Sequence, residues 1–219
     1  MEVDVRAMNQ LMNLLFKAAY RDPSFRRSLL RGLKMAVEEG FHDFGDGRGP
    51  VPAHQHPRGG GWVANTAFVE DSAFIGADAT VFGRAEVHED ASVYDKAKVF
   101  GNSLVLGNAK ILGKAKISEF AQVQGVARIE GDAWVFGNAK VTGKAKISGQ
   151  ARVFGDARVD GGTEVGDFAK VYGDAWVTQK AVVGGFAEVY EHAIVCERAK
   201  VLGNAVIKGH AKVTGKVSG

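Results

Sequence analysis

The sequence predicts an all-β protein, a parallel solenoid of short strands, preceded by a pair of short helices. Three observations predict the solenoid. A Val or Ile stands at every sixth residue from Val63 to Val213, which makes 26 positions without an insertion. A small residue follows four positions later, and Gly stands two positions after 16 of the 26. Such an unbroken short repeat requires each unit to stack on the next one.

Residues 1–40 are expected to form a helical hairpin. Apolar residues recur at helical spacing between Val5 and Ala19. Asp22 and Pro23 then offer a cap and a first helical turn, and a second amphipathic stretch ends at Gly40. Two helices this short bury little apolar surface by themselves, so we expect them to dock on the solenoid, on another copy or on a partner.

Residues 41–61 are predicted to be a linker, and residues 62–219 the repeat domain. The linker assignment follows from composition, since this segment is rich in Gly, Pro and His. From residue 62 onward the hexapeptide period takes over without interruption.

Each repeat unit is expected to be a short strand followed by a tight corner. Ala139 and Val141 illustrate the unit, because residues two apart in a strand point to the same side. Lys140, between them, points outward. The Gly at 143 supplies a corner residue that tolerates positive φ, and Asn65, Asp71, Asp95 and Asp167 fill equivalent positions.

These repeats resemble those of the hexapeptide-repeat, left-handed parallel β-helix superfamily. The aliphatic residue and the small residue match over residues 63–213, whereas the Gly stands one position later than in the usual motif. The resemblance implies triangular coils made of three hexapeptides each, and therefore between eight and nine coils. At a strand spacing of about 4.8 Å the prism would be roughly 40 Å long.

Since three hexapeptides make one coil, residues 18 positions apart are expected to lie in one column along the prism. Counting by 18 places aromatic residues in one such column. The outward residue after the Val or Ile on this face is aromatic in six of nine coils, whereas the other two faces hold one aromatic, Tyr94, at 17 equivalent positions. Trp134 lies on the same face. We expect a stacked ladder made of Phe82, Phe100, Trp134, Phe136, Phe154, Tyr172 and Tyr190.

This ladder is interpreted as an oligomer interface. Monomers rarely expose apolar patches above a few hundred Å², and each aromatic side chain offers on the order of 150 Å². Members of the superfamily typically trimerise with their prisms side by side, so the resemblance implies a homotrimer. A carbohydrate or peptide groove, and a ladder that stays solvated, are the alternatives.

The resemblance also implies a second candidate activity, acyl transfer. Many members use an acyl-CoA donor in a cleft between subunits, with a His as general base and a loop projecting from a coil. The repeat domain has no insertion, which disfavours such a pocket. His88, an outward strand residue, is the weak catalytic candidate, although no carboxylate is expected to orient it. His192 and His210 are expected at corners, one coil apart.

His54 and His56 are weak candidates for metal ligands. An H-x-H pair on a threefold axis would supply six imidazoles, an octahedral set suited to a transition metal. No cofactor is otherwise expected.

Composition excludes several classes of protein. The net charge is only +3, which favours no nucleic acid. No apolar run is long enough to span a membrane, and Met1-Glu-Val-Asp lacks a signal-peptide layout, so we expect cytoplasmic synthesis. The single Cys, Cys196, is expected to be a surface thiol.

Together these features predict a structural or attachment module without catalytic activity. The last hexapeptide is incomplete, and an uncovered last coil would present strand edges to a partner. A second protein is expected at that coil or at the helical hairpin. Plain prisms of this kind resemble bacteriophage virion components, such as spikes or capsid-decorating trimers, and a hexapeptide acyltransferase is the alternative.

Overall fold

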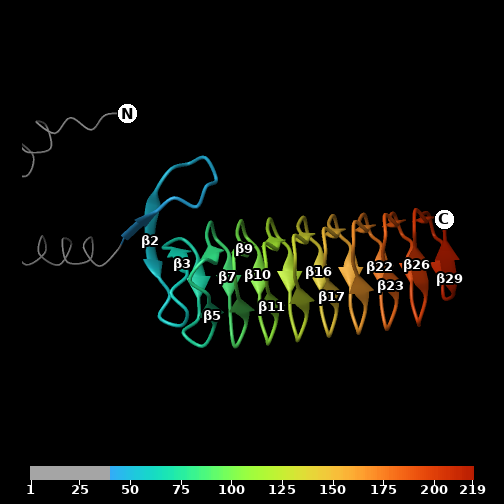
Figure 1. Ribbon diagram of the computed structural model, residues 1–219, viewed down its shortest axis with the longest axis horizontal. Helices are drawn as coiled ribbons and strands as arrows, with labels where there is room; N and C mark the ends of the chain where they lie inside the picture. Colours follow the sequence, from blue (N-terminus) through green and yellow to red (C-terminus); the bar gives the residue numbers. More distant parts are fainter. Residues whose placement is uncertain (1–39) are drawn as a thin grey trace, which may run out of the picture. The chain divides into compact units, whose positions relative to one another are not determined.

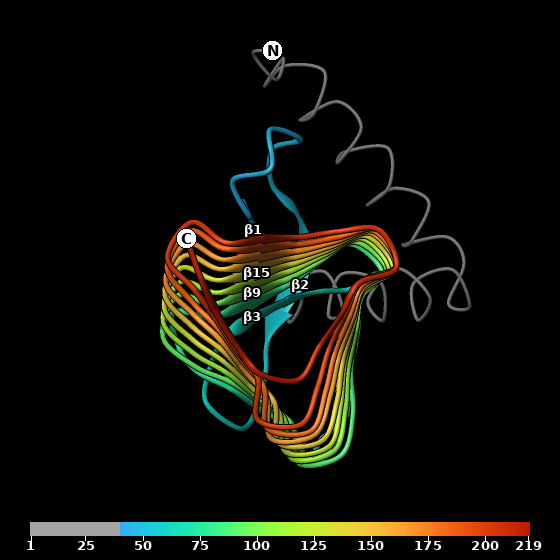
Figure 2. The same cartoon turned by 90° about the vertical axis from the view of Figure 1, so that its right-hand side faces the viewer.

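The computed structural model describes residues 40–219, which form a parallel β-solenoid. Residues 1–39 of the predicted helical hairpin lie outside the described residues. From His42 to Gly219 the chain is one compact unit. Its coils stand side by side along one axis (Figure 1), and the view along that axis shows a three-sided outline (Figure 2).

Three sheets form the three sides, and one strand from each sheet makes one coil. Sheet 1 consists of β1 (Gly40–His42), β2 (Val51–Gln55), β3 (Trp62–Ala64), β6 (Thr80–Val81), β9 (Lys98–Val99), β12 (Lys116–Ile117), β15 (Trp134–Val135), β18 (Arg152–Val153), β21 (Lys170–Val171), β24 (Glu188–Val189) and β27 (Val206–Ile207). Sheet 2 consists of β4 (Phe68–Val69), β7 (Glu86–Val87), β10 (Leu104–Val105), β13 (Gln122–Val123), β16 (Lys140–Val141), β19 (Arg158–Val159), β22 (Trp176–Val177), β25 (Ile194–Val195) and β28 (Lys212–Val213). Sheet 3 consists of β5 (Phe74–Ile75), β8 (Ser92–Val93), β11 (Lys110–Ile111), β14 (Arg128–Ile129), β17 (Lys146–Ile147), β20 (Glu164–Val165), β23 (Val182–Val183), β26 (Lys200–Leu202) and β29 (Lys216–Ser218).

The Val/Ile series is the core of the solenoid. Of its 26 positions, 24 are buried, and Val69 and Val213, in the first and last strands of sheet 2, are partly buried against the same cluster. Partners in adjacent coils are separated by three hexapeptides, as are Val105 and Val123. Each aliphatic side chain therefore packs on its equivalent in the next coil, which confirms the predicted parallel solenoid.

Two polar residues replace Ala in the core. Ser103 and Thr163 are fully buried, and each hydroxyl donates to a carbonyl three residues earlier, at Phe100 and Asp160. The hydrogen bonds remove the desolvation cost that an unpaired hydroxyl would carry.

Positive φ recurs at the corners, as the repeat predicts. Every residue that stands two positions after the Val or Ile, from Gly83 to Gly209, has positive φ. Seven of these residues are not glycine, and five of the seven are Glu or Gln, which the sequence did not lead us to expect. Asn65 and Asp71 occupy equivalent positions but do not adopt this conformation.

Both ends of the solenoid depart from the repeat. At the first coil, β2 pairs antiparallel with β3, aligning His54 with Val63, so the segment expected to be a linker contains sheet strands. At the last coil, β29 pairs with β26 with Val217 opposite Val201. This coil is two residues shorter than the others, because Val217 takes the inward position that the hexapeptide period assigns to Gly219.

Candidate functional site

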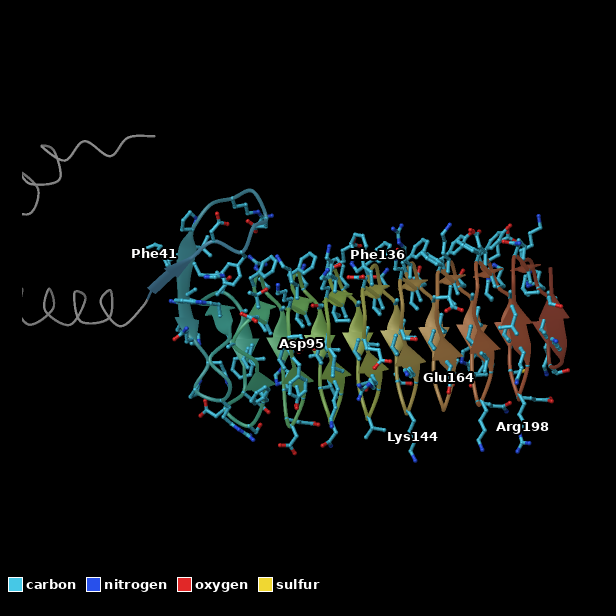
Figure 3. The ribbon with its side chains drawn as sticks, viewed as in Figure 1. Phe41, Asp95, Phe136, Lys144, Glu164 and Arg198 are labelled. Carbon is cyan, nitrogen blue, oxygen red and sulfur yellow. The ribbon has the colours of Figure 1, made fainter. Side chains whose placement is uncertain are left out.

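The aromatic column on sheet 1 forms stacked rings, as counting by 18 predicts. Figure 3 shows Phe136 on the opposite edge of the solenoid from Lys144 and Arg198. Neighbouring rings are nearly parallel because the coils repeat without slippage. The centroid distances and interplanar angles are 5.0 Å and 3° for Phe82–Phe100, 4.8 Å and 5° for Phe136–Phe154, 4.8 Å and 3° for Phe154–Tyr172, and 4.8 Å and 7° for Tyr172–Tyr190.

Trp134 covers the break in this ladder. Ser118 stands where the column lacks an aromatic residue, and Trp134 Nε1 donates a 2.9 Å hydrogen bond to Ser118 Oγ. Ser118 is 1% exposed, and the indole centroid lies 4.4 Å from that of Phe136. The indole therefore supplies aromatic surface at a coil whose own column residue is a serine.

The ladder begins before the repeat, at Phe44. This residue lies in the loop between β1 and β2, is 4% exposed, and stacks on Phe82 at 4.9 Å. Lys98 Nζ donates to the Phe44 carbonyl at 3.0 Å. The loop of residues 43–50 is thus fastened to the outer side of sheet 1. The projecting loop that the repeat domain lacks is supplied by the N-terminal segment.

A cavity of about 470 Å³ lies between this loop and the first coils. Its floor is apolar and aromatic, and Asp46 and Arg48 stand on the loop side. The side chain of Arg48 is 81% exposed, and its Nε lies 3.9 Å from Asp46 Oδ2. The lining residues are Phe44, Asp46, Arg48, Val51, Pro52, Ala64, Asn65, Thr66, Phe82, Gly83, Phe100 and Gly101.

A second, shorter stack stands at the corner that leads into sheet 1. The rings of Phe168 and Phe186 are 4.8 Å apart and nearly parallel, and the residues are 45% and 61% exposed.

Glu188 contacts two polar side chains, Lys170 and the ladder residue Tyr172. Lys170 Nζ, two residues after Phe168, lies 2.8 Å from Glu188 Oε1. Tyr172 donates to the same carboxylate at 3.1 Å, and burial together with this bond raises the pKa of Tyr172 to about 12.

Stacking reduces the exposed fraction of the ladder side chains. Phe82 is only 7% exposed, and the ladder rings after it are half-buried because each ring covers the face of the next. Phe168 and Phe186, which are 45% and 61% exposed, are more exposed than any ring of the ladder. The apolar surface here consists of ring edges along the ladder together with the open rings of this second stack.

His88 lies between two carboxylates, contrary to the expectation that none would orient it. Its Nε2 lies 2.8 Å from Glu86 Oε2, and its Nδ1 lies 3.4 Å from Glu70 Oε1. Glu70 stands three hexapeptides earlier, so it belongs to the preceding coil. The hydrogen bond to Glu86, with a smaller contribution from Glu70, raises the pKa of His88. With both ring nitrogens engaged, the imidazolium form is stabilised, and neither nitrogen is free to act as a general base.

His54 and His56 differ in their surroundings. His56 is 2% exposed; its Nδ1 accepts from the Arg58 backbone N–H at 3.3 Å, and its Nε2 donates to the Glu70 carbonyl at 3.2 Å. His54 Nδ1 lies 3.0 Å from Asn65 Oδ1. Both ring nitrogens of His56 thus form hydrogen bonds with the backbone at the start of the solenoid. Within residues 40–219 no group of three His, Cys, Asp or Glu side chains is arranged to hold a metal ion.

Two further sequence predictions concern single side chains. Cys196, predicted to be a surface thiol, is only 6% exposed, which corrects that expectation. His192 and His210 are one coil apart at a corner, as expected, with their rings stacked at 4.9 Å, and His192 Nδ1 lies 3.4 Å from Asp174 Oδ2.

Two comparisons with known proteins return no match. No model of a known protein family matches this chain, and no curated protein is similar to it in sequence. In the part of the chain that the structure describes, no helix is long and apolar enough to cross a membrane.

Sequence reasoning missed three of these features. Phe44 lies outside the hexapeptide period, so counting by 18 does not reach it. Phe168 and Phe186 belong to a corner column that holds no other aromatic residue. Glu70 could have been found, because it stands one full coil before His88.

Proposed function

We propose that this chain is a rigid structural module that associates with copies of itself, as a homotrimer, through the outer face of sheet 1. The observation that supports this proposal is the continuous aromatic surface of that face. The ladder rings and the exposed pair Phe168 and Phe186 lie along one side of the solenoid. Partly exposed aromatic surface that extends over this many coils is unusual on a monomer, and the rings gain stabilisation if a partner excludes water from their edges.

Rigidity supports the same role. Backbone hydrogen bonds link each coil to the next, as from Phe154 to Val171 and from Tyr172 to Val189. Because each coil holds its neighbours in the same register, the aromatic residues keep a constant spacing along the axis. A side-by-side assembly of such prisms would align equivalent rings over several coils.

We place this module in an attachment role, with a bacteriophage virion as the proposed setting. The support is the resemblance of uninterrupted prisms to virion spikes and capsid-decorating trimers, which is an analogy of fold. In this role the prism would project, and another protein would bind at the N-terminal segment or at the last coil.

The interface is tested by the mass of purified protein in solution, measured by size-exclusion chromatography with light scattering. The test variant is Phe168→Ser with Phe186→Ser, which removes the most exposed rings of the proposed interface. The matched control is Phe68→Ser with Val126→Ser, because these residues are 53% and 50% exposed but lie in β4 of sheet 2 and at the corner between sheets 2 and 3. We expect the test variant to dissociate at concentrations where wild type and control remain trimers. Equal masses for all three proteins would refute the interface.

An acyltransferase is the second candidate, favoured by the cavity beneath the loop of residues 43–50. A projecting loop that shapes an apolar pocket is what acyl transfer on such a scaffold requires. Stabilisation by an acyl-CoA, seen as a rise in melting temperature that depends on ligand concentration, would support it. No rise at saturating acyl-CoA would exclude this candidate.

A further inference from the structure

Four lysines form a square on the outer face of sheet 1 and at the corner that leads into it. Lys98 in β9 and Lys116 in β12 are direct register partners. Lys96 and Lys114 stand two residues before them, on the same outward side, and are also one coil apart. Lys98 is partly covered and the other three are exposed. Four positive charges therefore gather within a patch that is two coils high.

These lysines have no salt-bridge partner among the residues that the structure describes. Among the same residues, the one hydrogen bond from an ammonium group of the square goes from Lys98 to the carbonyl of Phe44. The registered pair Arg128 and Lys146 on sheet 3 differs, because Glu130 lies 2.5 Å from the first and 2.7 Å from the second. Like charges directly opposite each other destabilise adjacent strands, so an anion bound at the lysine square would relieve repulsion.

A depression of about 290 Å³ adjoins the lysine square. Arg152, two coils beyond Lys116, closes its far side, and Lys116 Nζ lies 5.7 Å from the centroid of the Trp134 indole. Asp132 is the one carboxylate in its lining, and Gln150 adds an amide. The complete lining is Lys114, Lys116, Asp132, Trp134, Gln150 and Arg152.

We propose that this depression binds a small phosphate-bearing molecule. Ammonium and guanidinium groups form charge-assisted hydrogen bonds with phosphate oxygens, and three such groups converge here from Lys114, Lys116 and Arg152. Asp132 and Gln150 can accept from hydroxyl groups on the rest of the ligand. Two sources share this chemistry, an inorganic phosphate chain and a phosphate ester that carries hydroxyls. Trp134 belongs both to this lining and to the proposed trimer interface, so we expect the ligand to compete with self-association, and Phe168→Ser with Phe186→Ser serves as the monomeric form in the titration.

The test is isothermal titration of the full-length protein at low and at physiological ionic strength. Tripolyphosphate represents the inorganic source and glucose 6-phosphate the hydroxyl-bearing ester. The test variant is Lys114→Gln with Lys116→Gln. The matched control is Lys140→Gln with Arg158→Gln, a registered pair of cations on sheet 2 whose loss changes the net charge equally. All four side chains are exposed, so both variants should fold, which melting curves will verify.

We expect at least one probe to bind wild type and the control alike, and to bind the test variant about tenfold or more weakly, as the loss of one or two charge-assisted hydrogen bonds implies. Tighter binding of glucose 6-phosphate than of tripolyphosphate would assign the site to a phosphate ester, and the reverse to an inorganic chain. Failure of both probes to bind wild type would overturn the proposal. So would equal weakening in the two variants, since that would reflect overall charge alone.

Discussion

At the scale of single residues, the corners restrict the sequence most severely. Gly137 has φ of +70°, and a Cβ there would lie 2.7 Å from the backbone nitrogen of Gly155 in the next coil. Where an acidic residue takes the corner instead, its carboxylate can cap the next coil, as Glu191 accepts from the Gly209 N–H at 2.8 Å. Both solutions follow from the direct stacking of corners.

Gly137→Ala is therefore expected to destabilise the solenoid by about 2 kcal/mol, from the positive φ and the backbone clash together. Gly215→Ala is the matched control, because Gly215 lacks a positive φ and has no atom within 4 Å of the added Cβ. Urea unfolding of both variants measures the difference. Equal stabilities would contradict the stacking argument.

His88 predicts a pH dependence of stability. Its pKa in the folded protein is raised, chiefly by Glu86 and also by Glu70, so its contribution is fully present below the unfolded pKa of about 6.5 and is lost as pH rises through the folded pKa. Relative to His88→Gln, wild type should be more stable near pH 6, and the advantage should shrink toward pH 8. Melting temperatures across this range measure it, with His210→Gln as the control. A difference that stays constant with pH would show that His88 does not titrate between the carboxylates.

At the scale of elements, the aromatic ladder is completed by Trp134, a residue of the neighbouring column on sheet 1. Ser118 is buried beside the indole of Trp134, which donates to its hydroxyl. A count by 18 assigns one side chain to each coil and so treats Ser118 as a gap. In the structure the residue two positions before Phe136 covers that gap from the next coil.

Ser118→Phe should consequently destabilise the protein although it completes the aromatic column. The new ring needs space near the indole, and overpacking of this kind costs typically about 1–3 kcal/mol. Denaturant unfolding measures the cost, and a red shift of tryptophan emission reports displacement of Trp134. Lys208→Phe is the control, since it adds a ring next to Tyr190 at an exposed position. If Ser118→Phe proved as stable as wild type, Trp134 would not occupy that space.

At the scale of the whole molecule, the period predicted the fold because one rule is repeated in every coil. Val or Ile at every sixth position and Ala two residues before it form the core, and the positions of the corners follow from this spacing. The structure of the first coil was not predicted, since β2 pairs antiparallel with β3 and Phe44, which stacks on the ladder, lies before the hexapeptide repeats. The shorter last coil was not predicted either, because the spacing from Val213 to Val217 is two residues less than the hexapeptide period.

The candidate site was predicted only in part for the same reason. A column of identical positions locates Phe136, Phe154, Tyr172 and Tyr190, but not the contacts between columns. The hydrogen bond that places Glu188 beside Tyr172 and the Trp134–Ser118 bond both join neighbouring columns. Such contacts depend on rotamers, which the repeat period does not determine.

The most direct test of the central claim is sedimentation equilibrium of the wild-type chain over a wide range of concentrations. We predict a mass three times that of the 23.3 kDa chain, retained on dilution. A mass of one chain at every concentration, including the highest, would contradict self-association through the outer face of sheet 1.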